Sequence, residues 1–189
     1  MAILNVRQLG EECLTKKCKP VKLITSRTVQ LVEDMLDTMY ESNGVGLAAP
    51  QVGVLKRIVV IDTTPEPEVI DGVEQPVKEQ MYVMINPVIL TEEGEQRGWE
   101  GCLSYSGMSG IVTRPNEVTV EYTNLDGERC TLYGTGLLAR AISHEVDHLD
   151  GIMYTERAEK GSVITNEQLE KLLEEQEEGT DETDIHGNA

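Results

Sequence analysis

The residues best able to do chemistry form an H-E-x-x-H motif that runs from His144 to His148. Two histidines at positions i and i+4 of a helix project from one face, close enough to share one metal ion. Glu145 lies beside them and could handle the protons of a metal-activated water. A competing interpretation is a chance match on a solvated helix, where these side chains simply face water. The helical spacing around the motif and a total of three histidines in the chain favour the metal site.

Two histidines do not complete a catalytic metal site, so the third ligand decides the class of protein. One large class of proteases continues the motif as H-E-x-x-H-x-x-G-x-x-H. Here Gly151 fits that pattern, but Tyr154 occupies the last position. A glutamate ligand, as in other zinc proteases, would have to be Glu156, Glu159 or a residue of the tail, all in polar surroundings. The remaining histidine, His186, lies in the acidic tail and is a poor candidate.

A cysteine is the strongest remaining donor, and Cys102 lies in the segment WEGCLS at 99–104. We expect irregular flanks here, because glycine lets the backbone approach a ligand closely. A thiolate would complete a Cys-His-His set, although spacing alone is equally compatible with a small buried apolar residue, as most free cysteines are. Cys13, Cys18 and Cys130 are interpreted as structural thiols, since their spacing matches neither a metal knuckle nor a disulfide framework.

A third segment, GVGLAAPQ at 44–51, combines two glycines with small residues and a glutamine. The glycines permit positive φ or close approach of a ligand. Gln51 is a neutral donor that could face a developing oxyanion. Taken alone, the segment is equally compatible with a turn that leads from a helix into a core strand.

The elements that must position these residues follow from hydrophobic periodicity. An amphipathic helix is predicted over 26–41, ending near Asn43-Gly44, and a second helix over 137–149 carries the H-E-x-x-H motif. Strands are predicted at four β-rich runs, with a long exposed loop at 63–80 between the first two and a hairpin formed by the last two: 57–62, 81–85, 118–122 and 129–133. The strands precede the last long helix. This order predicts an α+β fold in which mixed or antiparallel strands pack around a C-terminal metal-binding helix.

Length and composition favour one globular domain, because the chain has 189 residues, of which 39% are hydrophobic and 26% charged. We expect a catalytic domain over 1–164, followed over 165–189 by an acidic helix and, from Gly179, a disordered tail. The formal net charge of −18 argues against nucleic acid as a ligand. No run approaches the roughly 20 apolar residues of a membrane span, and no secretory signal is recognised, so we expect a cytoplasmic protein.

The segments 44–51, 100–104 and 144–151 together resemble, in the same order, the three motifs of peptide deformylases. The resemblance extends from about Val6 to about Tyr154 and includes Arg114-Pro115 and 136–140. It implies that one divalent metal ion is bound by Cys102, His144 and His148, with water or hydroxide in the fourth position. It further implies Fe²⁺ as the ion in a bacterial cell, with Zn²⁺, Ni²⁺ or Co²⁺ as ions found in preparations.

The resemblance also implies a reaction, which is removal of the formyl group from formyl-methionine at the start of nascent polypeptides with release of formate. Glu145 would take a proton from the activated water and deliver it to the departing amine. The Gln51 side chain and the Leu103 backbone N–H would face the oxyanion. Gly46 would bond the substrate backbone. The methionine pocket would be lined by Val45, Leu103 and Ala141.

Further expectations concern the surroundings of the site and its partners. Asp147 and Asp150 are candidate acceptors for the N–H groups of the ligand histidines, with an exposed helical face as the simpler interpretation. Family resemblance brings transient proximity to the ribosome into consideration, although an acidic tail would be repelled by RNA. Neither direct nucleic-acid binding nor membrane binding is expected.

Two alternatives to the deformylase remain open on the sequence. One is a zinc endopeptidase whose third ligand is not a cysteine, and the other is a non-catalytic module whose metal only stabilises the fold. The deformylase is favoured because it alone explains the segments 44–51 and 100–104.

Overall fold

The computed structural model of the chain describes residues 2–67, 69–70, 73–74 and 77–181. Its helices, in chain order, are η1 (Glu12–Thr15), α1 (Ser26–Glu41), η2 (Ala49–Val52), α2 (Gly136–Leu149), α3 (Tyr154–Arg157) and α4 (Asn166–Asp181). Its strands are β1 (Gly46–Ala48), β2 (Ile58–Asp62), β3 (Val69–Ile70), β4 (Val73–Glu74), β5 (Met81–Glu93), β6 (Gln96–Cys102), β7 (Tyr105–Arg114), β8 (Glu117–Thr123), β9 (Arg129–Thr135) and β10 (Ile164–Thr165). None of the described helices is both long enough and apolar enough to span a bilayer.

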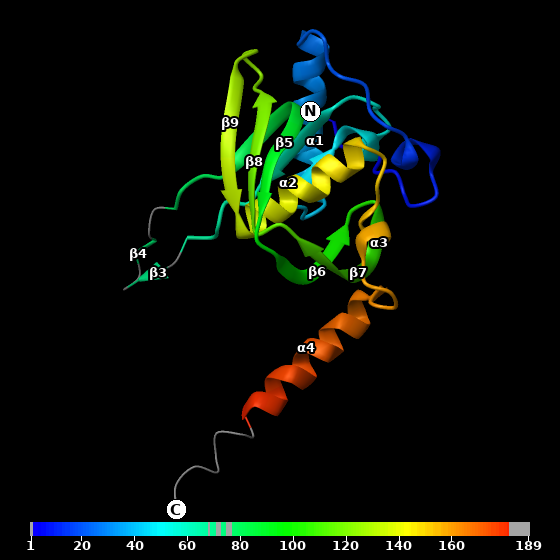
Figure 1. Ribbon diagram of the computed structural model, residues 1–189, viewed down its shortest axis with the longest axis vertical. Helices are drawn as coiled ribbons and strands as arrows, with labels where there is room; N and C mark the ends of the chain where they lie inside the picture. Colours follow the sequence, from blue (N-terminus) through cyan, green and yellow to red (C-terminus); the bar gives the residue numbers. More distant parts are fainter. Residues whose placement is uncertain (1, 68, 71–72, 75–76, 182–189) are drawn as a thin grey trace, which may run out of the picture.

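The strands form one large sheet and two smaller ones (Figure 1). The large sheet has the order β1-β2-β5-β8-β9, and each neighbouring pair in it is antiparallel. A second sheet has the order β10-β7-β6, and β3 pairs with β4 in a short hairpin. Strand β1 lies at one edge of the large sheet, with β2 as its ladder partner. The predicted α+β fold with antiparallel strands is therefore confirmed.

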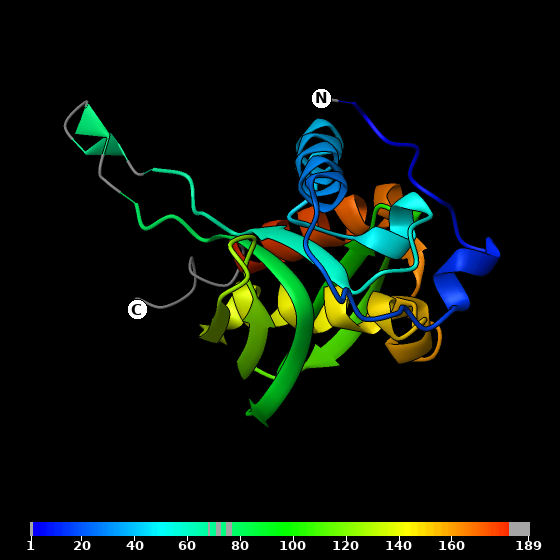
Figure 2. The same cartoon turned by 90° about the horizontal axis from the view of Figure 1, so that it is seen from above.

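Helices cover both faces of the large sheet, as Figure 2 shows for α1 and α2. In β2, Val59 and Ile61 pack with the apolar residues of α2, whereas Ile58 and Val60 pack with those of α1. A strand that is covered on both faces needs apolar residues at consecutive positions, which explains the uninterrupted run in β2. The H-E-x-x-H helix is consequently held against the sheet along its length.

Most predicted elements are confirmed. Helix α1 has the predicted bounds and begins at a capping box between Thr25 and Thr28. It ends where Asn43 adopts a φ of 53° and the Gly44 N–H bonds to the carbonyl of Met39. Helix α2 begins one residue before the predicted start, and β8 and β9 form the predicted hairpin. Strand β5 runs well beyond its predicted end at 85, because its second half pairs with β8.

The expectation of irregular backbone around Cys102 is confirmed in part, because the β-ladder has a register shift between Gly101 and Cys102. Strands β6 and β7 form a hairpin there, and Cys102 ends the first of them, paired with Tyr105. Both strands are interrupted by glycines, which weaken the apolar alternation by which strands are recognised in a sequence. The segment 44–51, for which a turn that follows the first helix was one interpretation, contains β1 and η2.

Two segments extend away from the body of the molecule in Figure 1. The predicted loop at 63–80 forms an arm that carries β3 and β4. The acidic helix predicted from Thr165 is α4, which continues to Asp181. The tail that was expected to be disordered from Gly179 lies mostly at 182–189, outside the described residues, and His186 lies there as well.

Candidate metal centre and active site

Helix α2 and strand β6 bring the three predicted metal ligands together. The donor atoms of Cys102, His144 and His148 all lie within 4.8 Å of one another. The His148 Nε2 atom is 3.2 Å from the Cys102 Sγ atom and 3.2 Å from the His144 Nε2 atom. The two histidines come from successive turns of α2, and the cysteine comes from the end of β6.

These three residues fit a divalent cation in both geometry and charge. Ligands bonded at about 2.0–2.3 Å to a tetrahedral ion lie roughly 3.3–3.7 Å apart, close to the separations found here. A thiolate with two imidazoles suits zinc or iron. Burial opposes a charge on His144, yet Cys102 and Glu100 raise its pKa to about 10, so the surroundings favour positive charge at this point. Burial and the neighbouring His144 lower the pKa of His148 well below its ordinary value, which keeps that ring neutral and able to donate a lone pair.

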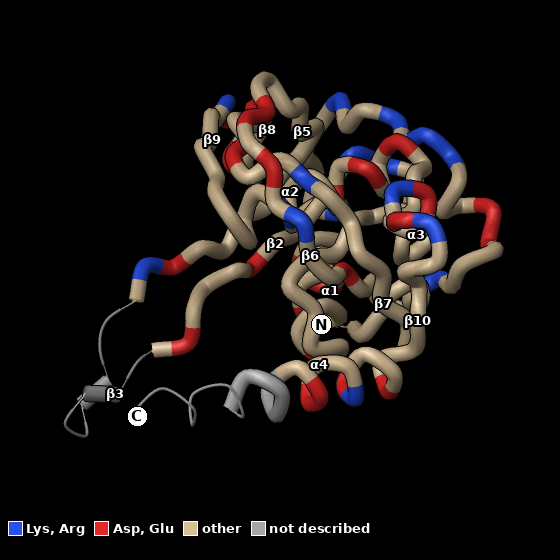
Figure 3. The backbone as a smooth tube through the Cα atoms, turned by 60° about the horizontal axis from the view of Figure 1, so that its bottom comes forward, with Lys and Arg blue, Asp and Glu red and all other residues tan. Residues whose placement is uncertain are grey.

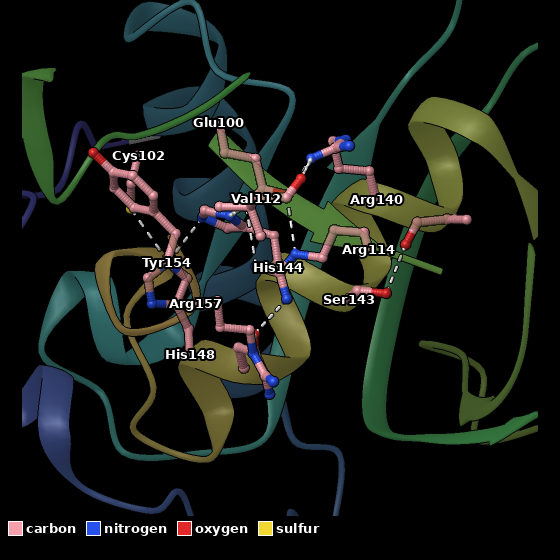
Figure 4. Close-up of polar contacts among 12 residues, drawn as sticks. Glu100, Cys102, Val112, Arg114, Arg140, Ser143, His144, His148, Tyr154 and Arg157 are labelled. Atoms are coloured by element: carbon pink, nitrogen blue, oxygen red, sulfur yellow. Dashed lines mark hydrogen bonds and ion pairs between the residues drawn. The ribbon is translucent and has the colours of Figure 1, made fainter. Parts of the chain in front are cut away.

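Glu100 fixes the orientation of the His144 ring (Figure 4). Its Oε2 atom lies 3.0 Å from the His144 Nδ1 atom, which leaves Nε2 to face the other two ligands. Arg114 donates to both oxygens of Glu100 at 2.9 and 3.0 Å, and Arg140 donates to Oε1 at 2.7 Å. Burial disfavours ionisation of Glu100, but the hydrogen bonds from His144 and Arg114 lower its pKa to about 2. The sequence contained no signal for this role, because the contact joins β6 to α2.

The expectation that Asp147 and Asp150 accept hydrogen bonds from the ligand histidines is wrong. Asp147 accepts from Arg114 at 2.5 Å and from Arg157 at 2.6 and 2.7 Å. Asp150 pairs with Arg57 at 2.9 Å. Neighbouring residues on a helix diverge by about 100°, so an aspartate next to a ligand histidine faces a different direction. Asp147 is nevertheless 8% exposed, so the interpretation of an exposed face fails for it too.

Gln51 presents its amide nitrogen to the metal ligands. Its Oε1 atom accepts a hydrogen bond from the backbone N–H of Ala48 at 2.7 Å. This bond distinguishes the oxygen of the amide from its nitrogen. Its Nε2 atom then donates to the Cys102 Sγ atom at 3.4 Å and to the Ser104 Oγ atom at 3.2 Å. Gln51 is 1% exposed, so the donor is held in a fixed place. Ser104 was not predicted to belong to the site.

Glu145 lies buried beside the metal ligands, with 4% of its surface exposed. Its Oε2 atom has no hydrogen-bond partner among the residues that the structure describes. Burial raises the pKa of Glu145 to about 7, which suits a group that takes up and releases a proton near neutral pH. The backbone of β1 passes close by, since a Cβ atom on Gly46 would lie 2.5 Å from the Glu145 Oε1 atom. A side chain at position 46 would therefore displace the Glu145 carboxylate.

A cavity of about 510 Å³ opens in front of these groups. It is lined by all the residues predicted to bind substrate: Val45, Gly46, Leu103 and Ala141. Gln51, Cys102, His144 and Glu145 also line it. Residues that sequence reasoning did not assign to it include Met108, Leu137, Arg140 and Asn166. The contributions of Met108 and Asn166 depend on the β6–β7 hairpin and on the start of α4, neither of which the sequence placed near the site.

Comparisons with known proteins all find deformylases. A family model described as polypeptide deformylase matches residues 3–163. The chain is 50% identical over 159 residues to a peptide deformylase of Agathobacter rectalis, and the match covers 84% of this chain and 92% of that relative. It is 46% identical over 174 residues to a peptide deformylase of Acetivibrio thermocellus, which covers 92% of this chain and 93% of that relative.

Solved structures give the same result. A peptide deformylase from Synechococcus elongatus in complex with actinonin superposes with a TM-score of 0.75 at 38% identity, over 85% of this chain and 83% of that one. A Met-Ala-Ser-bound peptide deformylase from Acinetobacter baumannii superposes with a TM-score of 0.74 at 37% identity, over 82% of this chain and 98% of that one.

Proposed function

This chain belongs to the polypeptide deformylase family, and on that premise we propose that Cys102, His144 and His148 hold the metal ion with which it works. The enzyme is a hydrolase that removes the formyl group from the amino terminus of formyl-methionyl polypeptides. The observation that carries the site assignment is the convergence of one thiol and two imidazoles beside a cavity, next to a buried Glu145 carboxylate oxygen that lacks a hydrogen-bond partner among the described residues.

When bound, a divalent ion supplies a Lewis acid for the formyl group and activates the attacking water. We propose Fe²⁺ as the ion in the cell, with Zn²⁺, Ni²⁺ or Co²⁺ as substitutes in preparations, since thiolate and imidazole donors accept all of them. Glu100 supports this role by holding the Nδ1 side of His144, so that Nε2 remains the donor.

Glu145 moves the protons. It takes one from the water that attacks the formyl carbon and delivers it to the amine nitrogen as the C–N bond breaks, so that formate and a polypeptide with a free amino group leave. Its burial and its unpaired Oε2 atom leave the carboxylate available for both steps.

Negative charge that develops on the formyl oxygen meets two donors, the Gln51 side-chain amide and the Leu103 backbone N–H. The amide is pre-oriented by its bond to Ala48, so no reorganisation is needed at the moment of reaction. Leu103 follows the ligand Cys102 directly and lines the same cavity.

The peptide substrate binds along strand β1. This strand is an edge strand, and Gly46 lines the cavity, so a peptide can add to its unpaired side through backbone hydrogen bonds. Val45, Leu103 and Ala141 then supply the walls of a pocket for the methionine side chain. The Met-Ala-Ser-bound structure of the Acinetobacter relative supports a methionine-headed peptide at this cavity.

We further propose that the substrates are nascent chains and that the enzyme works in the bacterial cytoplasm, where formylated chains begin. This places it transiently near ribosomes. Contact between α4 and ribosomal RNA is disfavoured, because acidic side chains lie along the described part of α4 (Figure 3). The negative charge of RNA repels them.

The test is formate release from a formyl-Met-Ala peptide by iron-loaded protein that has been prepared without oxygen. We expect release by the wild type and its loss in Glu145→Ala at unchanged metal content. Metallated wild-type protein that releases no formate would overturn the assignment.

An endopeptidase with a non-cysteine third ligand finds no support in the site. Glu156 accepts the backbone N–H of Met153, and Glu159 forms a bidentate pair with Arg97, so both candidate glutamates are engaged elsewhere. Cys102→Ala should therefore lose the metal. A variant that kept both metal and activity would favour the protease.

A further inference from the structure

We propose that helix α3 positions the metal ligand His144 through two of its side chains, Arg157 and Tyr154. The inference rests on the proposed metal site and adds to it an element beyond the H-E-x-x-H helix. Helix α3 has four residues, and its first and last residues lie three apart, so their side chains point from the same face. Figure 4 shows both of them beside α2.

Arg157 begins a series of ion pairs that ends at His144. Its Nε and Nη2 atoms donate to the two oxygens of Asp147 at 2.6 and 2.7 Å. The Asp147 Oδ2 atom also accepts from Arg114 at 2.5 Å. Arg114 in turn holds both oxygens of Glu100, and Glu100 accepts from His144. Positive and negative side chains alternate from Arg157 to Glu100.

Most of this series is buried, which makes its charge balance matter. The side chains of Arg114 and Glu100 are each 4% exposed, and that of Asp147 is 11% exposed. With Arg157 in place, Asp147 shares its charge between two guanidinium groups. Without Arg157, the charge of Asp147 is balanced by Arg114 alone. Asp147 then draws the Arg114 guanidinium away from Glu100. A partly satisfied buried network loses its fixed geometry, so Glu100 would hold His144 less firmly.

Tyr154 acts on the same histidine from another side. Its ring lies nearly parallel to the His144 ring, with centroids 6.1 Å apart and an interplanar angle of 23°. The tyrosine is 1% exposed, and its hydroxyl donates to the carbonyl of Met108 on β7 at 3.2 Å. The ring therefore limits how far His144 can tilt, while the hydroxyl ties α3 to the neighbouring sheet.

If α3 only stabilised the fold, removing any anchor of its segment should weaken metal binding to a similar degree. The pair Arg97–Glu159 also fastens this segment to the β6–β7 hairpin, with two bonds of 2.6 and 2.8 Å. Among the described residues, no hydrogen bond or ion pair joins the Arg97–Glu159 pair to the series that ends at His144. Arg97→Ala is therefore a matched control, since it removes a bidentate anchor of the same segment without touching that series.

The experiment measures Co²⁺ binding to metal-free protein, by titration and by the visible absorption of the bound ion, alongside thermal unfolding without metal. We expect Arg157→Ala to weaken Co²⁺ binding ~10–100-fold and to alter the spectrum. Arg157→Lys should fall between it and the wild type, because an ammonium cannot form the bidentate pair. Arg97→Ala should bind Co²⁺ as the wild type does.

A second pair of variants tests the ring. Tyr154→Phe keeps the ring and should keep the wild-type spectrum, whereas Tyr154→Leu should weaken binding. Should Arg157→Ala fail to fold, Arg157→Lys and the two Tyr154 variants decide the matter. The proposal is overturned if Arg157→Lys and Tyr154→Leu bind Co²⁺ as the wild type does, or if Arg97→Ala loses as much affinity as Arg157→Ala. Wild-type protein that binds no Co²⁺ would instead overturn the metal site itself.

Discussion

The proposed proton transfer depends on Glu145, whose buried Oε2 atom has no hydrogen-bond partner in the described part of the chain. Glu145→Gln keeps the size of the side chain but removes its ability to accept a proton. We expect kcat for a formyl-Met peptide to fall ~10²–10⁴-fold, with metal content unchanged. Glu167→Gln, on the exposed start of α4, should retain full activity. A Glu145→Gln enzyme that keeps most of its rate would remove the carboxylate from the mechanism.

Gln51 is the proposed oxyanion donor, and its hydrogen bond from the Ala48 N–H fixes its position. Gln51→Glu keeps an oxygen for the Ala48 N–H but replaces the donor Nε2 atom with a second acceptor. Loss of one such donor costs ~10²–10³ in rate, and we expect this loss in kcat rather than in KM, because the charge develops only during the reaction. Steady-state kinetics at saturating metal would show it. An increase in KM alone would assign Gln51 to substrate binding.

At the residue scale, the sequence reveals only part of the site. Spacing within one helix identified His144, Glu145 and His148, because helical geometry converts that spacing into proximity. Cys102 could not be separated from an ordinary buried cysteine by spacing, and the family resemblance was needed to choose. Glu100 stayed hidden although it lies two residues before Cys102, since its partners come from β7 and α2.

At the scale of elements, strand β1 must pass the Glu145 carboxylate with almost no clearance. Gly46→Ala would put a Cβ atom 2.5 Å from the Glu145 Oε1 atom, so the carboxylate has to move. A displacement of about 1 Å in an active site can cost ~10²-fold in rate, and we expect a loss of that order. Unfolding should change little, because a carboxylate can shift toward the cavity. The measurements are kcat and the thermal unfolding temperature of the Gly46→Ala variant. An unchanged kcat would show that the Glu145 carboxylate can move without loss of activity.

The elements that the sequence predicted well are those with regular apolar spacing. Helices α1 and α2 and the β8–β9 hairpin were placed to within a few residues. The β6–β7 hairpin was missed because its glycines break the alternation and its pairing depends on α3 and β10 packed against it. Strand β1 was missed because three residues are too few to show a period. Both omissions lie at the active site, where close backbone approach favours glycine over apolar side chains.

At the scale of the whole molecule, part of the net charge of −18 lies in α4. From Glu170 to Gln176 every residue of α4 is exposed. A helix of this length with little packing is marginal in water. The start of the helix is different, because Asn166 accepts from Ser109 at 2.8 Å and lines the cavity, and β10 pairs with β7.

These contacts predict where the chain can be shortened. A chain that ends at Gln168 keeps β10 and Asn166, so we expect kcat/KM within about twofold of the full chain and nearly the same unfolding temperature, because tolerance to truncation follows burial and hydrogen bonding. A chain that ends at 163 keeps the whole region that the family model matches but loses β10. For this shorter chain we expect a lower unfolding temperature and a lower kcat/KM, since β7 loses a ladder partner beside the cavity. Equal behaviour of the two truncations would place the boundary of the catalytic domain near 164, as the sequence alone predicts. Loss of activity in both would instead assign the exposed part of α4 a role in catalysis.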